Sequence, residues 1–329
     1  MLRIFHGTRY DFIKWWRAMA IATATFIVLG LGSELFTGGL HRSIDFTGGT
    51  LMQLAFKQRP DVGQLRSALD AGGVHDAEIT QFGSDREYTV RAQNAAAIAT
   101  AGTRGAESVA RRVENVLTQR FGAGAFQVVR TEAVGPRVGD ELQRGAIIAV
   151  LVSFALTLVY LWFRFEWRFG LAAVIATAHD ILTTIAFISL MRLEVSLTVI
   201  AAILTVIGYS LNDTIIIFDR VRENLRKHRG MPLYDLVNLS VNETLPRSVL
   251  THATTLGATL ALLFFAGEVI RPFAWVMAFG IFTGTFSSIY VASSILIWIE
   301  RRYPRAVVDA RRAPAARPAV RSDRTLAAS

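Results

Sequence analysis

The stretch VSLTVIAAILTVIGYSLNDTIIIFDRVREN, residues 195–224, decides how this chain folds. From Val195 to Phe218 its only charged residue is Asp213, and about twenty apolar residues cross a hydrocarbon core of about 30 Å as one helix. A charged side chain near the bilayer centre costs roughly 2.5 to 3.5 kcal/mol, and such groups usually face a bundle interior and carry protons, ions or substrate. Asp213 is therefore the first candidate functional residue.

The composition of the whole chain is that of a membrane protein. Its 329 residues are 52% hydrophobic with a mean hydropathy of +0.38, which is too apolar for an ordinary soluble domain. A window of about twenty residues predicts six membrane-spanning helices, with one long loop after the first. The predicted spans are Trp15–Leu35, Gly145–Phe163, Phe169–Leu190, Val195–Phe218, Ser248–Gly267 and Phe273–Ile299.

Basic residues gather on one side of these predicted spans. The short loops on the other side carry only Arg192 and Arg271. By the positive-inside rule, we expect a multi-pass protein of the bacterial inner membrane with both termini in the cytoplasm and the segment 35–144 outside. The basic residues are Arg3, Arg9, Lys14, Arg17, Arg164, Arg168, Arg220, Arg222, Arg226, Lys227 and Arg229, together with the arginines that follow Glu300.

The chain accordingly divides into five parts. We predict a cytoplasmic N-terminus (1–14), a first transmembrane helix (15–35), a periplasmic α/β domain with its connector (36–143), transmembrane helices two to six (144–300) and a basic, disordered cytoplasmic tail (301–329). The first span is long and has no Ala-x-Ala cleavage pattern after it, so we interpret it as an uncleaved anchor. With no cysteine, the outer domain depends on its own hydrophobic core.

The net charge of +9 indicates contact with membrane lipids and not nucleic-acid binding. A basic soluble chain would suggest a nucleic-acid partner, but here the basic residues lie at span ends, where they contact anionic lipid headgroups. We therefore expect no nucleic-acid binding.

The outer domain has a readable order of strands and helices. The segment from Ile44 to Gln58 alternates as a half-buried strand does, and a helix after Pro60 ends at Gly72. Strands are predicted at 78–82 and 87–92, a second helix at 105–121 and a last strand at 125–134. The order βαββαβ predicts a ferredoxin-like domain between helices one and two, with two helices on one face of a four-stranded sheet.

Polar groups inside the predicted spans form the candidate site. Asp213 lies in span four, and Arg247 opens span five on the same predicted side. We hypothesise that the two pair in one state and separate in another, so that protonation of Asp213 releases Arg247. A static ion pair that fixes helix register is the alternative. Possible supporting residues are Asn212, Thr251, Thr255, His179, Asp180 and His252.

These supporting residues have structural interpretations as well. His179 and Asp180 lie near the middle of span three, where a helix-packing hydrogen bond explains them as readily as a proton role. His252 either fills space or takes part in a proton path. Thr251, Thr255 and Thr259 follow Arg247 at i, i+4 spacing on one face of span five. Asp219 is interpreted as a surface charge at the headgroup boundary.

Several kinds of chemistry are not predicted. The pattern G-x-x-x-x-G-K-[ST] is absent from the sequence, so nothing here hydrolyses a nucleotide in the P-loop manner. We expect no enzymatic activity, no cofactor and no metal site; energy would come from a gradient or a partner. In span six, Gly280 and Gly284 have the GxxxG spacing that permits close helix contact.

Several further motifs lie between residues 44 and 292. They are Asp45-Phe46-Thr47-Gly48-Gly49-Thr50, Val134-Gly135-Pro136 with Gly139 and Glu141-Leu142, Phe163-Arg164-Phe165-Glu166-Trp167-Arg168, Ala178-His179-Asp180, Gly208-Tyr209-Ser210-Leu211-Asn212-Asp213-Thr214, Phe218-Asp219-Arg220-Val221-Arg222-Glu223-Asn224 and Gly284-Thr285-Phe286-Ser287-Ser288-Ile289-Tyr290. Together these motifs closely resemble those of a known family, the SecF proteins of the SecD/SecF family within the RND superfamily.

The resemblance implies an α-helical membrane protein that forms half of an RND-type transporter, completed by SecD. It also implies association with the SecYEG channel, often with YajC and YidC, and use of the proton motive force to promote translocation of preproteins. The family's proton-coupling aspartate and arginine correspond to Asp213 and Arg247. The chain departs from the family at Ser43, where glycine is common, and at His252, where a small polar residue is common.

Two other functions remain open on the sequence. A scaffold without energy transduction would hold partner subunits at the channel, and Asp213→Asn would leave it active. Half of an RND exporter for a small molecule or lipid is the third reading, although an outer domain of this size offers little enclosure for a substrate route.

Overall fold

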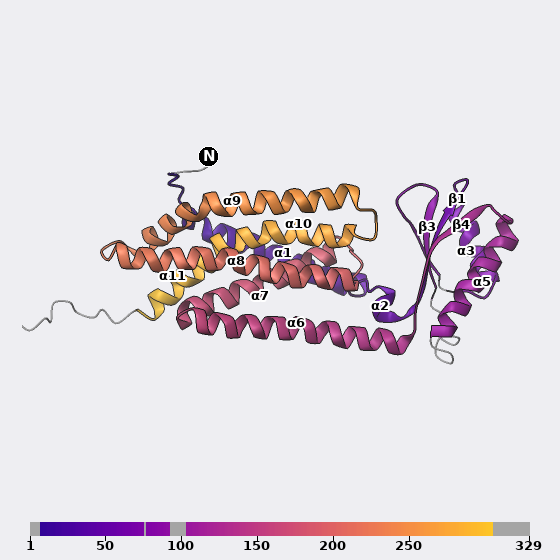
Figure 1. The fold of residues 1–329 in the computed structure, drawn as a ribbon, viewed down its shortest axis with the longest axis horizontal. Helices are drawn as coiled ribbons and strands as arrows, with labels where there is room; N and C mark the ends of the chain where they lie inside the picture. Colours follow the sequence, from indigo (N-terminus) through magenta and orange to yellow (C-terminus); the bar gives the residue numbers. More distant parts are fainter. Residues whose placement is uncertain (1–6, 76, 93–102, 305–329) are drawn as a thin grey trace, which may run out of the picture.

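The computed structural model describes residues 7–75, 77–92 and 103–304 (Figure 1). It contains a long helical bundle with a small sheet domain at one end, joined where α1 leads into α2 and where β4 leads into α6. Residues 1–6 of the predicted N-terminus and 305–329 of the predicted tail lie outside the described part of the chain.

Six helices in the described residues are long and apolar enough to cross a membrane, which confirms the predicted number of spans. The first five are α1 (Trp16–Thr37, after a short 3-10 turn at Ile13–Trp15), α6 (Pro136–Arg164), α7 (Trp167–Leu190), α8 (Leu197–Lys227) and α9 (Leu233–Phe265). The sixth is continuous and consists of α10 (Arg271–Phe286), the π-helical segment η2 (Ser287–Ala292) and α11 (Ser293–Arg302).

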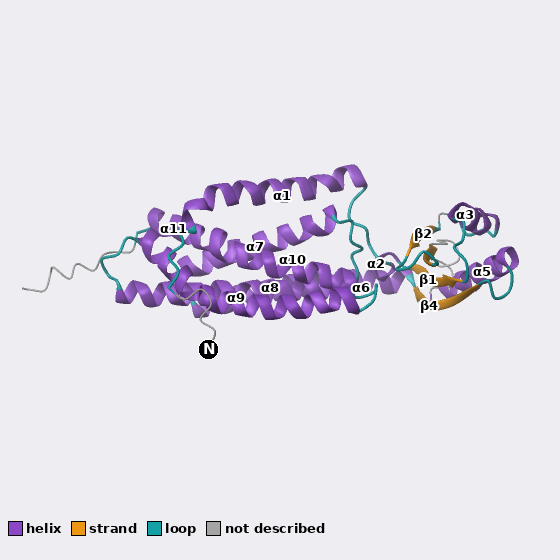
Figure 2. Cartoon of the chain, turned by 90° about the horizontal axis from the view of Figure 1, so that it is seen from above, coloured by secondary structure: helices purple, strands orange, loops and turns teal. Residues whose placement is uncertain are grey.

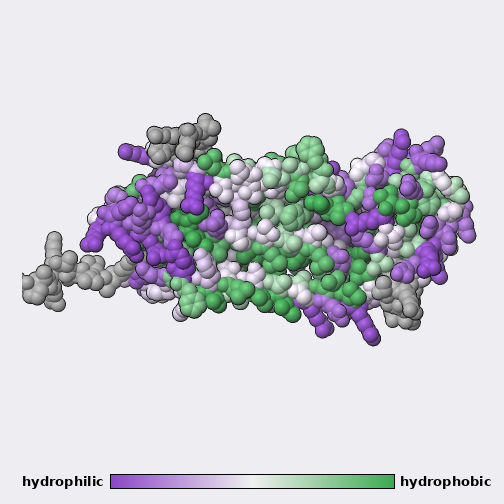
Figure 3. Space-filling view, viewed as in Figure 1, coloured by the Kyte–Doolittle hydropathy of each residue, from purple (hydrophilic) through white to green (hydrophobic). Residues whose placement is uncertain are grey.

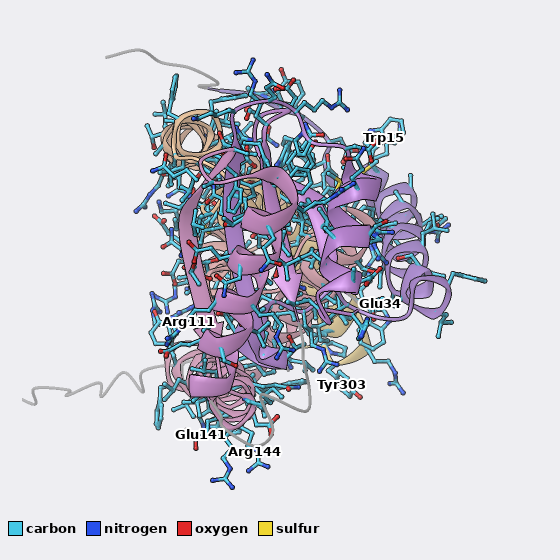
Figure 4. The ribbon with its side chains drawn as sticks, turned by 90° about the vertical axis from the view of Figure 1, so that its right-hand side faces the viewer. Trp15, Glu34, Arg111, Glu141, Arg144 and Tyr303 are labelled. Carbon is cyan, nitrogen blue, oxygen red and sulfur yellow. The ribbon has the colours of Figure 1, made fainter. Side chains whose placement is uncertain are left out.

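The helices differ in how far they lie inside the bundle. In their most apolar windows, α7 and α8 are 50% buried and the sixth helix 61%, whereas α1 and α6 are each only 6% buried. Helices α7 and α8 and the sixth helix therefore form the centre of the bundle. Glu141 and Arg144, on the exposed side of α6, lie at the outer edge in a view along the long axis (Figure 4).

Small residues permit the closest helix contacts. A Cβ added at Gly280 would lie 2.2 Å from a methyl carbon of Val206 on α8, and one at Gly284 would lie 2.9 Å from Cβ of Ser210. The predicted close contact at this GxxxG spacing is thereby confirmed, with α8 as the partner. Gly30 of α1 meets Ala186 of α7 in the same way, at 2.4 Å.

The helices extend beyond several predicted spans. The predicted span five begins at Ser248, but α9 begins at Leu233 and contains Pro246 in its interior. A hydropathy window detects only the apolar part of a helix, and polar helical turns outside that window go unseen. The same reason explains why α6 begins at Pro136 and α8 continues to Lys227.

The sheet domain has the predicted βαββαβ order. Its elements are β1 (Gly49–Phe56), α3 (Val62–Ala71), β2 (Glu78–Gln81), β3 (Glu87–Ala92), α5 (Thr103–Phe121) and β4 (Phe126–Val134). The strands are antiparallel in the order β2-β3-β1-β4, which is the ferredoxin-like arrangement. Figure 2 shows α3 and α5 on one side of the sheet, and Leu54, Leu65 and Leu117 are fully buried between these layers.

One part of the strand prediction is wrong. Ile44–Thr47 forms a single helical turn, α2, and β1 begins only at Gly49. Ser43 caps this turn by accepting a hydrogen bond from the Asp45 backbone. Gly48 then has φ of 69°, and an added Cβ would lie 3.1 Å from Cα of Pro136. The chain can therefore turn here and pass close to α6 only because residue 48 is glycine.

The sheet domain is joined to the bundle through the loop between α7 and α8. The backbone N–H of Ser43 donates to Val195 O at 2.8 Å, and that of Val195 donates to His41 O at 2.7 Å. Arg91 of β3 forms ion pairs with Glu78 and with Glu194 of this loop. Burial lowers the pKa of the Arg91 guanidinium, while the carboxylates of Glu78 and Asp45 act in the opposite direction.

Candidate functional site

Asp213 lies on α8 facing α9 and is 3% exposed. Its Oδ1 accepts a hydrogen bond of 2.5 Å from the Ser248 hydroxyl. Among the described residues, its Oδ2 has no hydrogen-bond partner. A buried carboxylate with one donor keeps unused acceptor capacity, so this group can take up a proton or a further donor without breaking an existing contact.

Arg247 does not pair with Asp213 in this structure. Its side chain is exposed and forms no ion pair or side-chain hydrogen bond within the described part of the chain. Its neighbour Ser248 makes the contact to Asp213 instead. Each residue along an α-helix turns by about 100°, which is why Ser248 points at α8 when Arg247 does not. The two-state pairing of Asp213 with Arg247 stays a prediction.

Tyr209 and His252 lie beside this carboxylate. Their rings meet edge to face with centroids 5.3 Å apart, and the Tyr209 hydroxyl donates to Thr251 O at 3.3 Å. His252 lies one turn after Ser248 on α9, and among the described residues its buried Nδ1 has no hydrogen-bond partner. A role of His252 in a proton path stays a prediction.

The threonines spaced four residues apart on α9, here called the threonine stripe, donate hydrogen bonds to carbonyls of their own helix. The hydroxyls of Thr251, Thr255 and Thr259 each donate to the carbonyl four residues earlier, at 3.0, 2.9 and 2.9 Å. Their donor hydrogens are therefore occupied, but each oxygen still has a free lone pair. Thr251, which is exposed, can accept a hydrogen bond from water or from a partner group, whereas Thr259 is buried.

The surface beside Asp213 is polar although it lies within the spans. Asn212, Arg247, Thr251 and Thr254 are all exposed in this chain, and Gly208 is exposed one turn before Asn212. Exposed polar groups at this depth are costly against hydrocarbon and normally face protein or water. This face of α8 and α9, here called the polar face, is thus suited to contact another protein. Figure 3 shows hydrophobic residues along the middle of the bundle and hydrophilic residues gathered at the end away from the sheet domain.

Asp180 occupies a different, saturated environment. It is 1% exposed, and its Oδ2 accepts hydrogen bonds from the hydroxyls of Ser210 on α8 and, at 2.7 Å, Ser287 on η2. Its Oδ1 lies 3.0 Å from His179 Nδ1, and His179 Nε2 lies 2.6 Å from the hydroxyl of Thr23 on α1. This network joins α1, α7, α8 and η2, as the helix-packing interpretation of His179 and Asp180 predicts.

The π-helical segment η2 positions two of these donors. It places Ser287 against Asp180 and Ser288 within 2.8 Å of the Thr214 hydroxyl on α8. A π-turn widens the helix by one residue and often occurs at functional positions. Here it lets two consecutive serines contact different residues of the bundle centre.

Asp219 forms ion pairs at the basic end of the bundle, as a boundary charge does. It accepts from Arg164 at 2.5 Å and from Arg222 at 3.5 Å. At the same end, Arg168 pairs with Glu300 and Arg220 with Glu243. Asp219 therefore differs from Asp213, because both oxygens of its carboxylate form ion pairs with arginines.

Sequence reasoning missed the serines of the site. Ser210, Ser248 and Ser287 donate to the two buried carboxylates, but none was predicted as a supporting residue. Ser210 and Ser287 lie inside the quoted family motifs, and Ser248 follows Arg247 directly. Of the predicted residues, Asn212 and Arg247 lie on the polar face, and neither forms a hydrogen bond or ion pair with Asp213 within the described part of the chain.

Comparisons with known proteins find similar sequences over most of this chain. The family described as protein export membrane protein SecD/SecF, C-terminal, matches residues 113–302, and the SecD/SecF GG motif matches residues 35–58. The chain is 60% identical over 306 residues to the protein translocase subunit SecF of Gemmatimonas aurantiaca, covering 93% of this chain and 91% of the relative. It is 44% identical over 290 residues to that of Desulfurispirillum indicum, covering 87% and 91%.

Two solved structures are similar in fold. A crystal structure of SecDF, a translocon-associated membrane protein from Thermus thermophilus, has a TM-score of 0.80 at 38% identity and covers 92% of this chain. A second SecDF structure, in a super-membrane-facing form, has a TM-score of 0.64 at 40% identity and covers 90% of this chain. The chain spans 40% and 39% of the length of these two SecDF chains.

Proposed function

This chain belongs to the SecD/SecF family of protein-export membrane proteins, and we propose that it is the SecF-type subunit that, with SecD, uses the proton motive force to promote preprotein translocation. It acts at the SecYEG channel of the inner membrane, with both termini in the cytoplasm and the sheet domain in the periplasm. YajC and YidC are further proposed partners. The subunit has no enzymatic activity of its own.

The observation that carries this proposal is the setting of Asp213. Its carboxylate is buried within a predicted span, holds one hydrogen bond and has a second oxygen without a partner among the described residues. Intramembrane acids of this kind commonly take part in proton relays. His252 and Tyr209 lie beside it, and the exposed threonines of α9 lead away from it.

The exposed polar face supports the proposal that a second membrane subunit binds at this site. Asn212 and Arg247 are exposed in the isolated chain, and a partner subunit that covers them would enclose Asp213 between two halves. The structural relatives are single SecDF chains of which this chain covers about two fifths, and we propose that SecD supplies the other half here. Pairing of Arg247 with Asp213 would then occur in another state of the cycle.

Asp213→Asn tests the proposal. The assay measures transport of a secreted protein into inverted membrane vesicles, with ATP present and the proton gradient imposed or collapsed. We expect the gradient to accelerate transport in the wild type and to have no effect in Asp213→Asn, with SecD still co-purifying. Loss of all response is expected because asparagine has the shape of aspartic acid but cannot release a proton.

Asp219→Asn is the matched control, since it removes a carboxylate from the same helix at a site of complete ion pairing. It should keep the response to the gradient. If Asp213→Asn vesicles respond as the wild type does, the chain is a scaffold without energy transduction. Co-purification of a small molecule or lipid whose export depends on Asp213 would instead favour the exporter function.

A further inference from the structure

The two halves of α1 contact the bundle differently. In the half near the sheet domain, Gly30 lies against Ala186, the Ser33 hydroxyl lies 2.9 Å from that of Ser189, and Phe26 stacks on Phe279 at 5.6 Å. In the half near the basic end, Trp16, Ala20 and Ala24 line an open cavity instead. Figure 2 shows α1 along one edge of the bundle, beside α7.

This cavity lies between α1 and the last span and measures about 480 Å³. Its walls are mainly apolar, with Ala20, Ala24 and Ile27 on one side and Ile295 and Trp298 on the other. Of the polar lining residues, Thr23 and His179 are hydrogen-bonded to each other, and Tyr234, Tyr290 and Ser294 also line the cavity. Small-molecule sites commonly have volumes of about 300 to 1,000 Å³ with apolar walls and few polar groups.

One fixed cation lies on this lining, Arg301 of α11. Its side chain is exposed and forms no ion pair within the described residues, whereas its neighbour Glu300 is paired with Arg168. Trp16 and Trp298 also line the cavity, and indole rings favour the level of lipid headgroups. The cavity therefore combines an apolar channel with a free guanidinium at the bundle end where ion-paired basic residues gather.

We propose that this cavity, between α1 and α11, binds an anionic phospholipid, with an acyl chain along Ala20, Ala24 and Ile295 and the phosphate at Arg301. A guanidinium binds phosphate oxygens in a planar, bidentate manner. The apolar walls exclude a free phosphate from the interior, so the lipid chain is part of what is recognised.

The size of the cavity argues against a helix of a partner subunit. An α-helix with side chains is about 10 Å across and rises about 5.4 Å per turn, so a volume of this size would hold only about one turn. An acyl chain is thin enough to enter between α1 and α11 without moving them. A lipid at this position would fill the space that α1 leaves when it diverges from the bundle.

Quenching of one tryptophan by brominated lipids tests the proposal. Trp298 is kept while Trp15, Trp16, Trp162, Trp167 and Trp275 are replaced by phenylalanine in the full-length chain, which is then reconstituted into vesicles. Brominated phosphatidylglycerol and brominated phosphatidylcholine are compared at the same low mole fraction. We expect about a fivefold preference for phosphatidylglycerol, from the roughly 1 kcal/mol that one basic residue contributes at an anionic surface.

Arg301→Gln should abolish this preference, while the neighbouring Arg302→Gln should retain it. Arg302→Gln is a matched control for Arg301→Gln, because each substitution removes one charge from the same helix end. Arg302 lies over the Tyr303 ring, away from the cavity lining. Ala24→Phe fills the cavity from an exposed position on α1 and should also abolish the preference. Two results would overturn the proposal. One is equal quenching by the two lipids in the chain that keeps only Trp298. The other is loss of the preference for phosphatidylglycerol in Arg302→Gln as well as in Arg301→Gln.

Discussion

Asp213 and Asp180 are two buried carboxylates in the same bundle, and their hydrogen bonds separate their roles. Asp180 is surrounded by three side-chain donors from α7, α8 and η2, whereas Asp213 has one. A buried charge with every acceptor satisfied fixes its neighbours, and removal of any partner costs free energy. We therefore infer a structural role for Asp180 and a proton-transfer role for Asp213.

Ser248→Ala is predicted to impair the Asp213 site. The substitution removes the one hydrogen bond that the described residues donate to the Asp213 carboxylate, and a hydrogen bond to a charged group contributes about 1.5 to 3 kcal/mol. We expect the gradient-stimulated part of transport to fall by roughly tenfold or more, since about 1.4 kcal/mol corresponds to a factor of ten. Transport into inverted vesicles with and without the gradient measures this.

Thr244→Val is the control for this prediction. Thr244 lies one turn earlier on α9, is buried, and donates only to carbonyls of its own helix. Its loss should leave the gradient response unchanged. Equal effects of the two substitutions would show that α9 packing, and not the bond to Asp213, is responsible.

At the residue scale, the sequence predicted that Asp213 is buried, which the structure confirms, but it did not predict which residue donates a hydrogen bond to it. Charge within an apolar run identified Asp213 without any knowledge of contacts. The donor to it is Ser248, one position after the predicted Arg247. Hydropathy places a residue at a depth in the membrane, but the direction in which it points depends on helix rotation, which packing sets.

At the scale of elements, close packing of α1 on α7 depends on one glycine. Gly30→Ala is predicted to separate these helices, because the new Cβ would lie 2.4 Å from Ala186 Cβ and 2.6 Å from its Cα. Overpacking of this kind typically costs about 1 to 3 kcal/mol. We expect a lower thermal unfolding midpoint in detergent.

A designed disulfide between α1 and α7 detects the separation of these two helices directly. The chain has no cysteine, and the hydroxyls of Ser33 and Ser189 are 2.9 Å apart, so a Ser33→Cys, Ser189→Cys pair should cross-link on oxidation. Gly30→Ala should suppress the cross-link. Gly32→Ala is the control, since nothing lies within 4 Å of its added Cβ; suppression by both would contradict the role of Gly30.

The elements themselves were largely predictable. Six apolar runs and a βαββαβ pattern are local properties of the sequence, and the bundle and sheet confirm them. The helical turn Ile44–Thr47 was not, because its alternation resembles that of a strand while Ser43 capping and the left-handed Gly48 favour a turn. The π-helical segment Ser287–Ala292 carries no hydropathy signal either.

At the scale of the whole molecule, Arg91 links the sheet domain to the membrane bundle. Its guanidinium bonds Glu78 within the domain, Glu194 between α7 and α8, and the carbonyl of Arg42. Since α8 carries Asp213, this junction is a direct physical route between the proposed proton site and the domain. A rigid junction would transmit a movement of α8 to the sheet.

Arg91→Ala is predicted to loosen that junction. Spin labels on Arg66 of α3 and on Leu190 at the end of α7, both exposed, allow the distance distribution between domain and bundle to be measured by pulsed electron resonance. We expect a broader distribution in Arg91→Ala, because Glu194 then loses its partner. Arg86→Ala, at a turn where Arg86 pairs only with Asp85, should leave the distribution unchanged. An unchanged width in Arg91→Ala would mean that the backbone contacts at Ser43 and Val195 hold the domain alone.

The sequence by itself determined the number of spans, the order of elements in the sheet domain and the existence of a buried acid at residue 213, because hydrophobicity, periodicity and charge are properties of neighbouring residues. Only the tertiary structure decided which hydroxyl faces which carboxylate, that Arg247 lies on an exposed polar face, and that α1 diverges from α11 around a cavity. These features depend on the rotation and spacing of helices that are far apart in the chain. Packing of small residues such as Gly30, Gly280 and Gly284 sets both.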